Sequence, residues 1–344
     1  MEQVKLQPGK LLDEKGSLLE RGYATSLVKG YDRRNIKAAA FRIKEWDYYI
    51  VYNDDYGVAL TLDDNYYIGL VSASFLDFKN RTERTVSPMT ILPMGKTKLP
   101  SSSVQGDVSY RNSKVELSYK NDGKSRFLTL NMKDFDNGQP LLVSIELFDE
   151  PKDSMVIATP FEKNKKAFYY NQKIIGMRAK GSMTCRGETY NFQPENSFGI
   201  MDWGRGVWTY SNKWYWGAGH GVVDGKVFGF NIGYGFGDTS AASENMLFYD
   251  GIAHKLDNIE FIIPKDSKGK YEFVKPWIYT SSDGRFEMDF TPILDRKAYI
   301  SLGLILSDQH QVFGYFDGNA VLDDGTVLKL NHFLGFAEVV RNKW

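Results

Sequence analysis

Short segments in which apolar and polar residues alternate run along most of the chain, and turn-forming residues bound each of them. The clearest segments read YYIVYN, VALTLDD, RFLTLNM, LLVSIELF, FEMDF and VLKLNHF. The turns between such segments fall at 52–57, 121–124, 136–139, 223–226, 282–285 and 323–326, and most contain Asp-Gly or Asn-Gly. Alternation with period two predicts β-strands, and these dipeptides predict tight hairpins. Because helical periodicity is weak, we expect an all-β protein of mostly antiparallel strands in barrels or sandwiches.

A polar, proline-containing stretch at 149–166 interrupts the strand pattern. It holds DEPKDSM and TPFEKNKK on either side of the short apolar run VIA. Such a stretch is typical of a boundary, so we expect two domains, residues 1–150 and 151–344, each of a size that suits one closed sheet. Residues 76–103 carry few regular signals and are expected to form a long connection or a flap.

Two neighbouring segments, 213–221 and 227–237, combine aromatic residues with glycines. With period two, the first segment places Trp214 and Trp216 on one face and glycines on the other. The second has a face of bulky apolar residues and a nearly bare face that carries glycines and Asn231. A row of glycines in a strand indicates either a sharp bend of the sheet or space for a ligand, and both interpretations stay open here.

The composition narrows the classes of partner. Lys plus Arg and Asp plus Glu each number 43, so the formal charge is zero, which argues against nucleic acid or an anionic membrane as a partner. No apolar run reaches the length of about 18 residues that would cross a bilayer, and the N-terminus lacks the apolar core of a signal peptide. The single cysteine, Cys185, cannot form an internal disulfide. We therefore expect a cytoplasmic protein without membrane insertion, as a monomer or a homodimer.

Motifs for metal or cofactor chemistry are missing from the sequence. The four histidines do not show metal-binding spacing, and there is no GxSxG, P-loop or helix-opening GxGxxG motif. We therefore expect neither a metal ion nor an organic cofactor, and Cys185 is interpreted as a small core residue. The chemistry that remains is that of carboxylates, hydroxyls, guanidinium groups and indoles.

The stretch MDWGRGVWTY at 201–210 concentrates these groups. Asp202 beside Trp203 fits an acid whose pKa an apolar wall raises, and such an acid donates protons near neutral pH. Arg205 would instead keep Asp202 ionised, and a buried Asp–Arg pair that fixes a β corner is the structural alternative. Farther along, Glu244 and Asn245 follow a Gly/Ser-rich stretch and fit either a polar loop or a second part of the site.

Several segments together resemble the bacterial family known as domain of unknown function 2804. They are EWDYYIVYN, ATPF, FYYNQK, DWGRGVWTY, WYWG, GFNIGYGFGDTSAASENM, DGIAHKLD and GFAEVV, in this order from about residue 8 to the C-terminus. DWGRGVW and SENM are the more specific of them. The family is distantly similar to carotenoid hydratases, tocopherol cyclases, AttH-like proteins and some pericyclic-reaction enzymes.

That wider similarity implies two tandem lipocalin-like barrels with a pocket between them. In the hydratase branch an Asp beside aromatic residues protonates an alkene, and Asp202 followed by Trp203 is the matching position. The sequence departs from that branch at Gly204-Arg205-Gly206, so the resemblance transfers the fold and the pocket more directly than a terpenoid substrate.

Our first hypothesis is therefore a cofactor-independent acid–base enzyme that acts on a small apolar or amphipathic molecule by hydration, elimination, cyclisation or isomerisation, or at a glycosidic bond. Asp202 is the predicted acid, Glu244 the base or hydrogen-bond acceptor, and Arg205 the group that orients the substrate or sets the charge of Asp202. The predicted substrate-binding residues are Trp203, Trp208, Trp214, Trp216, Asn231, Tyr234 and Asn245.

The second hypothesis is a non-catalytic, lipocalin-like carrier of a small molecule, which needs the aromatic residues but not paired carboxylates. A third treats Trp203–Trp216 as structural contacts between domains. For Lys173 in FYYNQK and Glu338 in GFAEVV, structural pairing is the favoured interpretation. If the carboxylates face one cavity, the enzyme hypothesis is favoured. If they form separate surface salt bridges, the carrier hypothesis is favoured.

Overall fold

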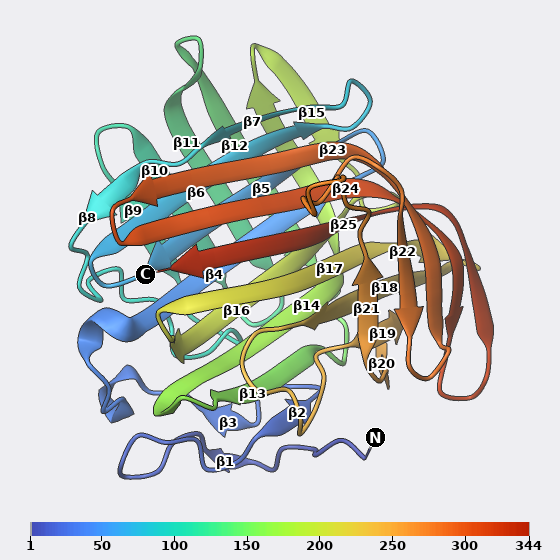
Figure 1. Cartoon of the computed structure of the whole chain (residues 1–344). Helices are drawn as coiled ribbons and strands as arrows, with labels where there is room; N and C mark the ends of the chain where they lie inside the picture. Colours follow the sequence, from blue (N-terminus) through green and yellow to red (C-terminus); the bar gives the residue numbers. More distant parts are fainter. Residues whose placement is uncertain (1, 344) are drawn as a thin grey trace.

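The computed structural model describes residues 2–343, and within this range it contains β-strands and two short 3-10 helices but no α-helix (Figure 1). The helices are η1 (Arg33–Asn35) and η2 (Ala40–Arg42). The strands form two large sheets and one parallel pair, β1 (Gly9–Lys10) with β3 (Lys29–Gly30). In this part of the chain no helix is long and apolar enough to span a bilayer.

The first sheet has 14 strands, and its main path runs β7-β6-β5-β4-β16-β14-β12-β11-β10-β9. Its neighbouring strands pair antiparallel. Its strands are β2 (Gly22–Ala24), β4 (Ile43–Tyr52), β5 (Tyr56–Asp64), β6 (Ile68–Asp77), β7 (Thr82–Val86), β8 (Met89–Ile91), β9 (Val108–Arg111), β10 (Val115–Asn121), β11 (Arg126–Asp136), β12 (Gln139–Phe148), β13 (Met155–Phe161), β14 (Asn164–Cys185), β15 (Glu188–Phe192) and β16 (Phe198–Val207).

The second sheet has nine strands in the order β20-β19-β18-β17-β25-β24-β23-β22-β21. Figure 1 shows the long strands β23, β24 and β25 crossing the first sheet and then curling over at one end, as in a half-barrel. The strands are β17 (Ser211–Val223), β18 (Lys226–Tyr234), β19 (Met246–Tyr249), β20 (Ile252–Lys255), β21 (Ile259–Ile262), β22 (Trp277–Ser281), β23 (Phe286–Leu302), β24 (Ile305–Val321) and β25 (Val327–Lys343). The prediction of an all-β fold with two barrel-like units is confirmed.

The predicted hairpins form where the turn dipeptides lie. Between β17 and β18, Asp224 and Gly225 have φ of 49° and 76°, and Val223 pairs with Lys226 across them. Two successive positive φ values define a turn whose twist matches that of the strands, which explains the Asp-Gly dipeptide. Asn137-Gly138, between β11 and β12, also has two positive φ values and closes the pair Asp136 and Gln139.

The chain leaves the first sheet after Val207 and enters the second at Ser211. The division predicted at residue 150 falls inside the first sheet, because β12 pairs directly with β14. Residues 76–103, expected to form a connection or flap, contain the end of β6 and all of β7 and β8, which pair with β6.

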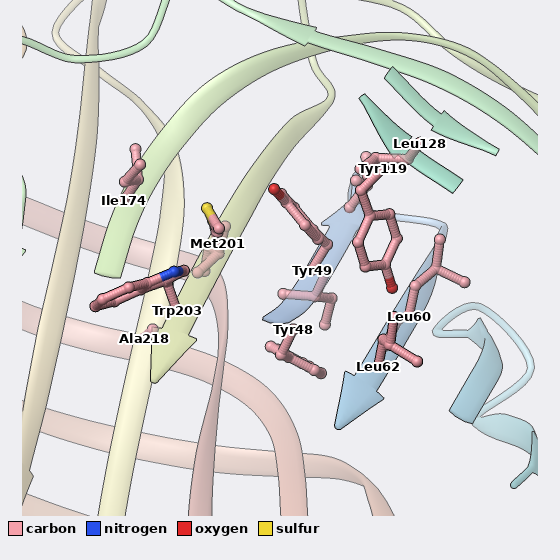
Figure 2. Close-up of a cluster of buried hydrophobic side chains, with 14 of the residues drawn as sticks. Tyr48, Tyr49, Leu60, Leu62, Tyr119, Leu128, Ile174, Met201, Trp203 and Ala218 are labelled. Carbon is pink, nitrogen blue, oxygen red and sulfur yellow. The ribbon is translucent and has the colours of Figure 1, made fainter. Parts of the chain in front are cut away.

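Buried apolar side chains cover the first sheet and pack in the region where it meets the second sheet. Figure 2 shows part of this cluster, with side chains from β4, β5, β10, β11, β14, β16 and β17. The glycine-bearing face of β18 takes part in the contact, since a Cβ on Gly229 would lie 2.5 Å from Ile175 Cγ2 on β14. At this position the missing side chain lets the two sheets approach each other, and it does not open ligand space.

Candidate active site

A cavity of about 270 Å³ lies between the two sheets. One side of its wall comes from β4, β5, β6, β7, β14 and β16, and the other from β17, β23, β24 and β25. Its wall combines many polar side chains with seven aromatic ones, Trp46, Tyr48, Tyr169, Trp208, Trp214, Trp216 and Phe236. The carboxyl groups of Asp202, Glu244 and Glu338 line the same cavity, together with the ammonium group of Lys173.

Lys173 links two of these carboxylates. Its Nζ lies 3.8 Å from Asp202 Oδ1 and 3.4 Å from Glu244 Oε2, and all three side chains are almost completely buried. Asn171 holds the arrangement together, because its Nδ2 donates to Asp202 Oδ1 at 2.6 Å and its Oδ1 accepts from Lys173 Nζ at 2.8 Å. The ammonium also lies 4.8 Å from the centre of the Trp216 ring. A buried charge cluster of this kind is stable only when each charge has partners.

Strand register explains why Lys173 and Asp202 meet. Lys173 on β14 lies directly opposite Asp202 on β16, so their side chains project from the same face of the sheet. Period two places Gly204 on that face as well, where a Cβ would lie 2.0 Å from the Trp46 indole. Gly204 therefore makes room for Trp46 in the cavity wall.

Glu244 belongs to the loop between β18 and β19, and its neighbours in the loop are also buried. Asn231 Nδ2 donates to the Glu244 carbonyl at 2.8 Å, and Asn231 Oδ1 accepts from Trp216 Nε1 at 2.8 Å. Asn245 accepts from Gly233 N at 2.7 Å and donates to Asp257 O. Asn231 and Asn245, which were predicted to anchor the substrate, therefore anchor the loop and do not line the cavity.

Glu338 projects from β25 between two neighbouring strands. It lies opposite Trp216 on β17 and opposite Gln311 on β24. Trp214 Nε1 donates to it at 3.2 Å, and Gln311 Nε2 at 3.4 Å. Burial raises the pKa of Glu338 to about 7, although Arg296 and the bond from Trp214 act in the opposite direction. A carboxyl group with such a pKa can give or take a proton near neutral pH.

Arg205 and Trp203 lie on the opposite face of β16 from Asp202. Arg205 Nη2 donates to Asp47 Oδ1 at 2.9 Å, and its guanidinium stacks on the Trp203 ring at 4.4 Å. Trp203 packs edge-on against Tyr31. Neither residue lines the cavity. The placement therefore does not support the predicted role of Arg205 toward the substrate or toward Asp202, because adjacent residues of a strand face opposite sides.

Three of the four remaining predicted substrate-binding residues line the cavity, and the fourth does not. Trp208, Trp214 and Trp216 line the cavity. Tyr234 stacks on Tyr215, with their ring centres 4.5 Å apart, and does not line it.

A second titratable group in the cavity wall, Asp63 on β5, was not predicted from the sequence. Burial raises the pKa of Asp63 to about 7, and burial lowers the pKa of the nearby Lys44 to about 7. Asn65 Nδ2 donates to Asp63 at 3.0 Å. An acidic residue within a strand is common, so nothing in the sequence around Asp63 indicated that it lines a cavity.

Metal ligands are not clustered in residues 2–343, where no group of three or more His, Cys, Asp and Glu side chains could hold an ion. Cys185 is buried, as expected of a core residue. The ionisable groups that line the cavity include the carboxyl groups of Asp202, Glu244 and Glu338 and the ammonium group of Lys173.

The geometry describes a two-sheet β protein with an aromatic, carboxylate-bearing cavity at the seam. The chain belongs to the family called domain of unknown function DUF2804, whose profile matches residues 2–344. No curated protein matches the sequence.

Two solved structures are similar in fold. Kievitone hydratase from Nectria haematococca is 14% identical, with 86% of this chain and 88% of that chain covered and a TM-score of 0.50. A putative AttH from Nitrosomonas europaea is 11% identical, with 90% and 96% covered and a TM-score of 0.50. At these identities the similarity establishes the fold, and it agrees with the resemblance drawn from the sequence.

Proposed function

We propose that this protein is an acid–base enzyme that adds water to, or removes it from, a carbon–carbon double bond of a small amphipathic molecule. The observation that carries the proposal is that Glu338, Asp202 and Glu244 line one aromatic cavity. One of the two structures with a similar fold is kievitone hydratase, which supports the same class of reaction.

In the hydration direction, protonated Glu338 gives its proton to one carbon of the double bond. A water molecule forms a carbon–oxygen bond to the other carbon and loses a proton to Asp202 or Glu244. The proton then returns to Glu338 through solvent, so the net change is the addition of one water molecule, and the reverse sequence is dehydration. We assign the acid role to Glu338 and not to Asp202 because the raised pKa of Glu338 suits a donor near neutral pH.

The cavity wall also indicates the kind of substrate. Its aromatic side chains offer flat apolar surfaces, while polar groups offer hydrogen bonds from both sheets, such as Thr61 and Ser72 on one side and Gln309 on the other. A ring-containing molecule with hydroxyl or carbonyl groups fits this combination.

The proposal is tested by turnover. Native mass spectrometry of the purified protein identifies any ligand that co-purifies, and this ligand and kievitone are the first probes. Incubation in water enriched in a heavy oxygen isotope should give a product that carries the label. Glu338→Gln should lower the rate by about 10²–10⁴-fold, whereas Glu260→Gln, an exposed carboxylate on β21, should leave it unchanged. An unchanged rate in Glu338→Gln refutes the assignment.

The rate should also follow the charge of Glu338. Because the donor must be protonated, kcat/KM for hydration should fall as the pH rises through about 7. A profile that is flat between about pH 6 and 8 would remove Glu338 from the acid role.

A non-catalytic carrier is the second candidate, and the aromatic wall favours it to the same extent. A carrier would release its ligand chemically unchanged. Glu338→Gln would then change neither the chemical structure of the bound ligand nor the time for which the ligand stays bound.

A further inference from the structure

Two loops at the mouth of the cavity expose large apolar side chains. The first begins at the end of β8 with Ile91 and continues with Leu92 and Met94, and the second is the turn between β23 and β24, which carries Leu304. Ile91 and Leu304 are each 81% exposed. Ordinary surfaces carry such residues singly, so a group of them around an opening indicates an interaction surface. We call these four residues the apolar rim.

The two loops lie at the same opening. Met89 in β8 and Ile300 in β23 both line the cavity, and Figure 1 shows β8 and the β23–β24 turn at the same end of the molecule. Arg296 Nη1 ties β23 to β6 by a 2.9 Å bond to Ser74 Oγ, and β8 pairs with β6. Tyr210 donates to the Leu304 carbonyl at 2.6 Å, which holds the second loop against the start of β17.

The backbone of the first loop is strained where it presents these side chains. Leu92 and Met94 have φ of 54° and 55°, in the left-handed region that non-glycine residues seldom adopt. Their amides donate to the carbonyls of Tyr67 and Tyr66, at 2.9 Å and 2.8 Å, which stabilises the conformation. A strained loop that directs apolar side chains into water needs a purpose other than packing.

Exposed lysines beside the apolar rim indicate the kind of surface to which the rim binds. Arg84, Lys96 and Lys98 lie between the acidic residues Glu83 and Asp107, and Arg296 and Lys297 lie between Asp295 and Asp308. Lys96, Lys98 and Lys297 are exposed. Lys96 and Lys98 directly follow Met94 of the rim, with no acidic residue between them. Apolar side chains flanked by lysines match the interface of an anionic bilayer, where acyl chains lie beneath negative headgroups.

We propose that the apolar rim docks the protein on an anionic lipid surface, so that an amphipathic substrate passes between the bilayer and the cavity. The proposal rests on the proposed function only in taking the cavity as the ligand site. Docking is peripheral, through loop side chains, and the strands keep the pairing described above.

The test is co-sedimentation of the full chain with vesicles of phosphatidylcholine alone and of phosphatidylcholine mixed with phosphatidylglycerol. Binding should be about 10- to 100-fold stronger on the mixed vesicles and should weaken with added salt. Ile91→Asp and Leu304→Asp should each lower it by about tenfold or more. The matched control is Val327→Asp, because Val327 is also exposed but lies at the start of β25, far along the strand from the rim. Its binding should equal that of the wild type.

The proposal is overturned if the wild type binds neither kind of vesicle, or if Val327→Asp weakens binding as much as the rim variants do. It is also overturned if sedimentation velocity shows a dimer that Ile91→Asp separates while vesicles fail to bind, because the rim then joins two copies of the chain. Vesicle binding is measured without substrate, and turnover of a water-soluble probe is measured without vesicles. Failure of docking is thereby distinguished from failure of the proposed reaction.

Discussion

Replacing Glu338 with glutamine should make the folded protein more stable at high pH while it abolishes catalysis. Glutamine keeps the shape and an acceptor for Trp214 Nε1, but it carries no charge. The carboxyl pKa rises from an ordinary 4.5 to about 7 in the folded protein, which corresponds to about 3 kcal/mol. This free energy is the cost of burying the ionised form.

The sign follows from proton linkage. Since the pKa of Glu338 is higher in the folded than in the unfolded chain, its contribution to stability is fully present below about pH 4.5 and is lost as the pH rises through about 7. The Glu338→Gln variant has no carboxyl group to ionise at this position, so it does not lose this stability as the pH rises. The difference in unfolding free energy between variant and wild type should therefore be constant at low pH and grow by up to about 3 kcal/mol, in favour of the variant, between about pH 5 and 8.

Urea unfolding of both proteins, followed by tryptophan fluorescence across this pH range, measures the difference. Other groups that titrate here, such as Asp63 and Lys44, are present in both proteins and cancel in the comparison. A difference that does not change with pH would refute the raised pKa, and with it the reason for naming Glu338 as the proton donor.

Two further substitutions test the rest of the site. Lys173→Met should destabilise the protein by about 3–5 kcal/mol at neutral pH, because the buried carboxylates of Asp202 and Glu244 lose their shared cation. Urea unfolding measures this change, and a loss of stability below about 1 kcal/mol would contradict the importance of the cluster. Gly233→Ala should lower both turnover and stability, because the new Cβ would lie 2.7 Å from Glu244 Oε1 and 2.7 Å from the Tyr215 carbonyl oxygen, whereas Gly30→Ala, which meets nothing within 4 Å, should be silent in both measurements.

The sequence predicted the fold class and a small part of the cavity wall because both depend on local patterns. Asp-Gly turns between alternating segments specify hairpins, and the period-two reading of 213–221 placed Trp214 and Trp216 together on the face that lines the cavity. The same period applied to 201–208 separates Asp202 from Trp203 and Arg205. Proximity along the chain suggested that these three residues share one pocket, although neighbours in a strand face opposite sides.

Other parts of the site depend on pairing between distant strands, which a single sequence does not report. Glu338 reaches the cavity because β25 pairs with both β17 and β24, and its raised pKa arises from burial. Asn231 and Asn245 were recognised as unusual polar residues, but their partners are the backbone and side chains of the Glu244 loop. The neutral total charge also did not indicate that Lys96 and Lys98 lie next to exposed apolar side chains.

The ion pair between Lys173 and Glu244 joins a strand of one sheet to a loop of the other. The cluster of Asp202, Lys173 and Glu244 is therefore incomplete in either sheet alone, and it forms only when the two sheets pack together. A substitution at the outer edge of either sheet should leave this cluster intact. A shift of one residue in the packing of the two sheets would separate Lys173 from Glu244. The alignment of the two sheets along their contact is therefore what brings these charged groups together.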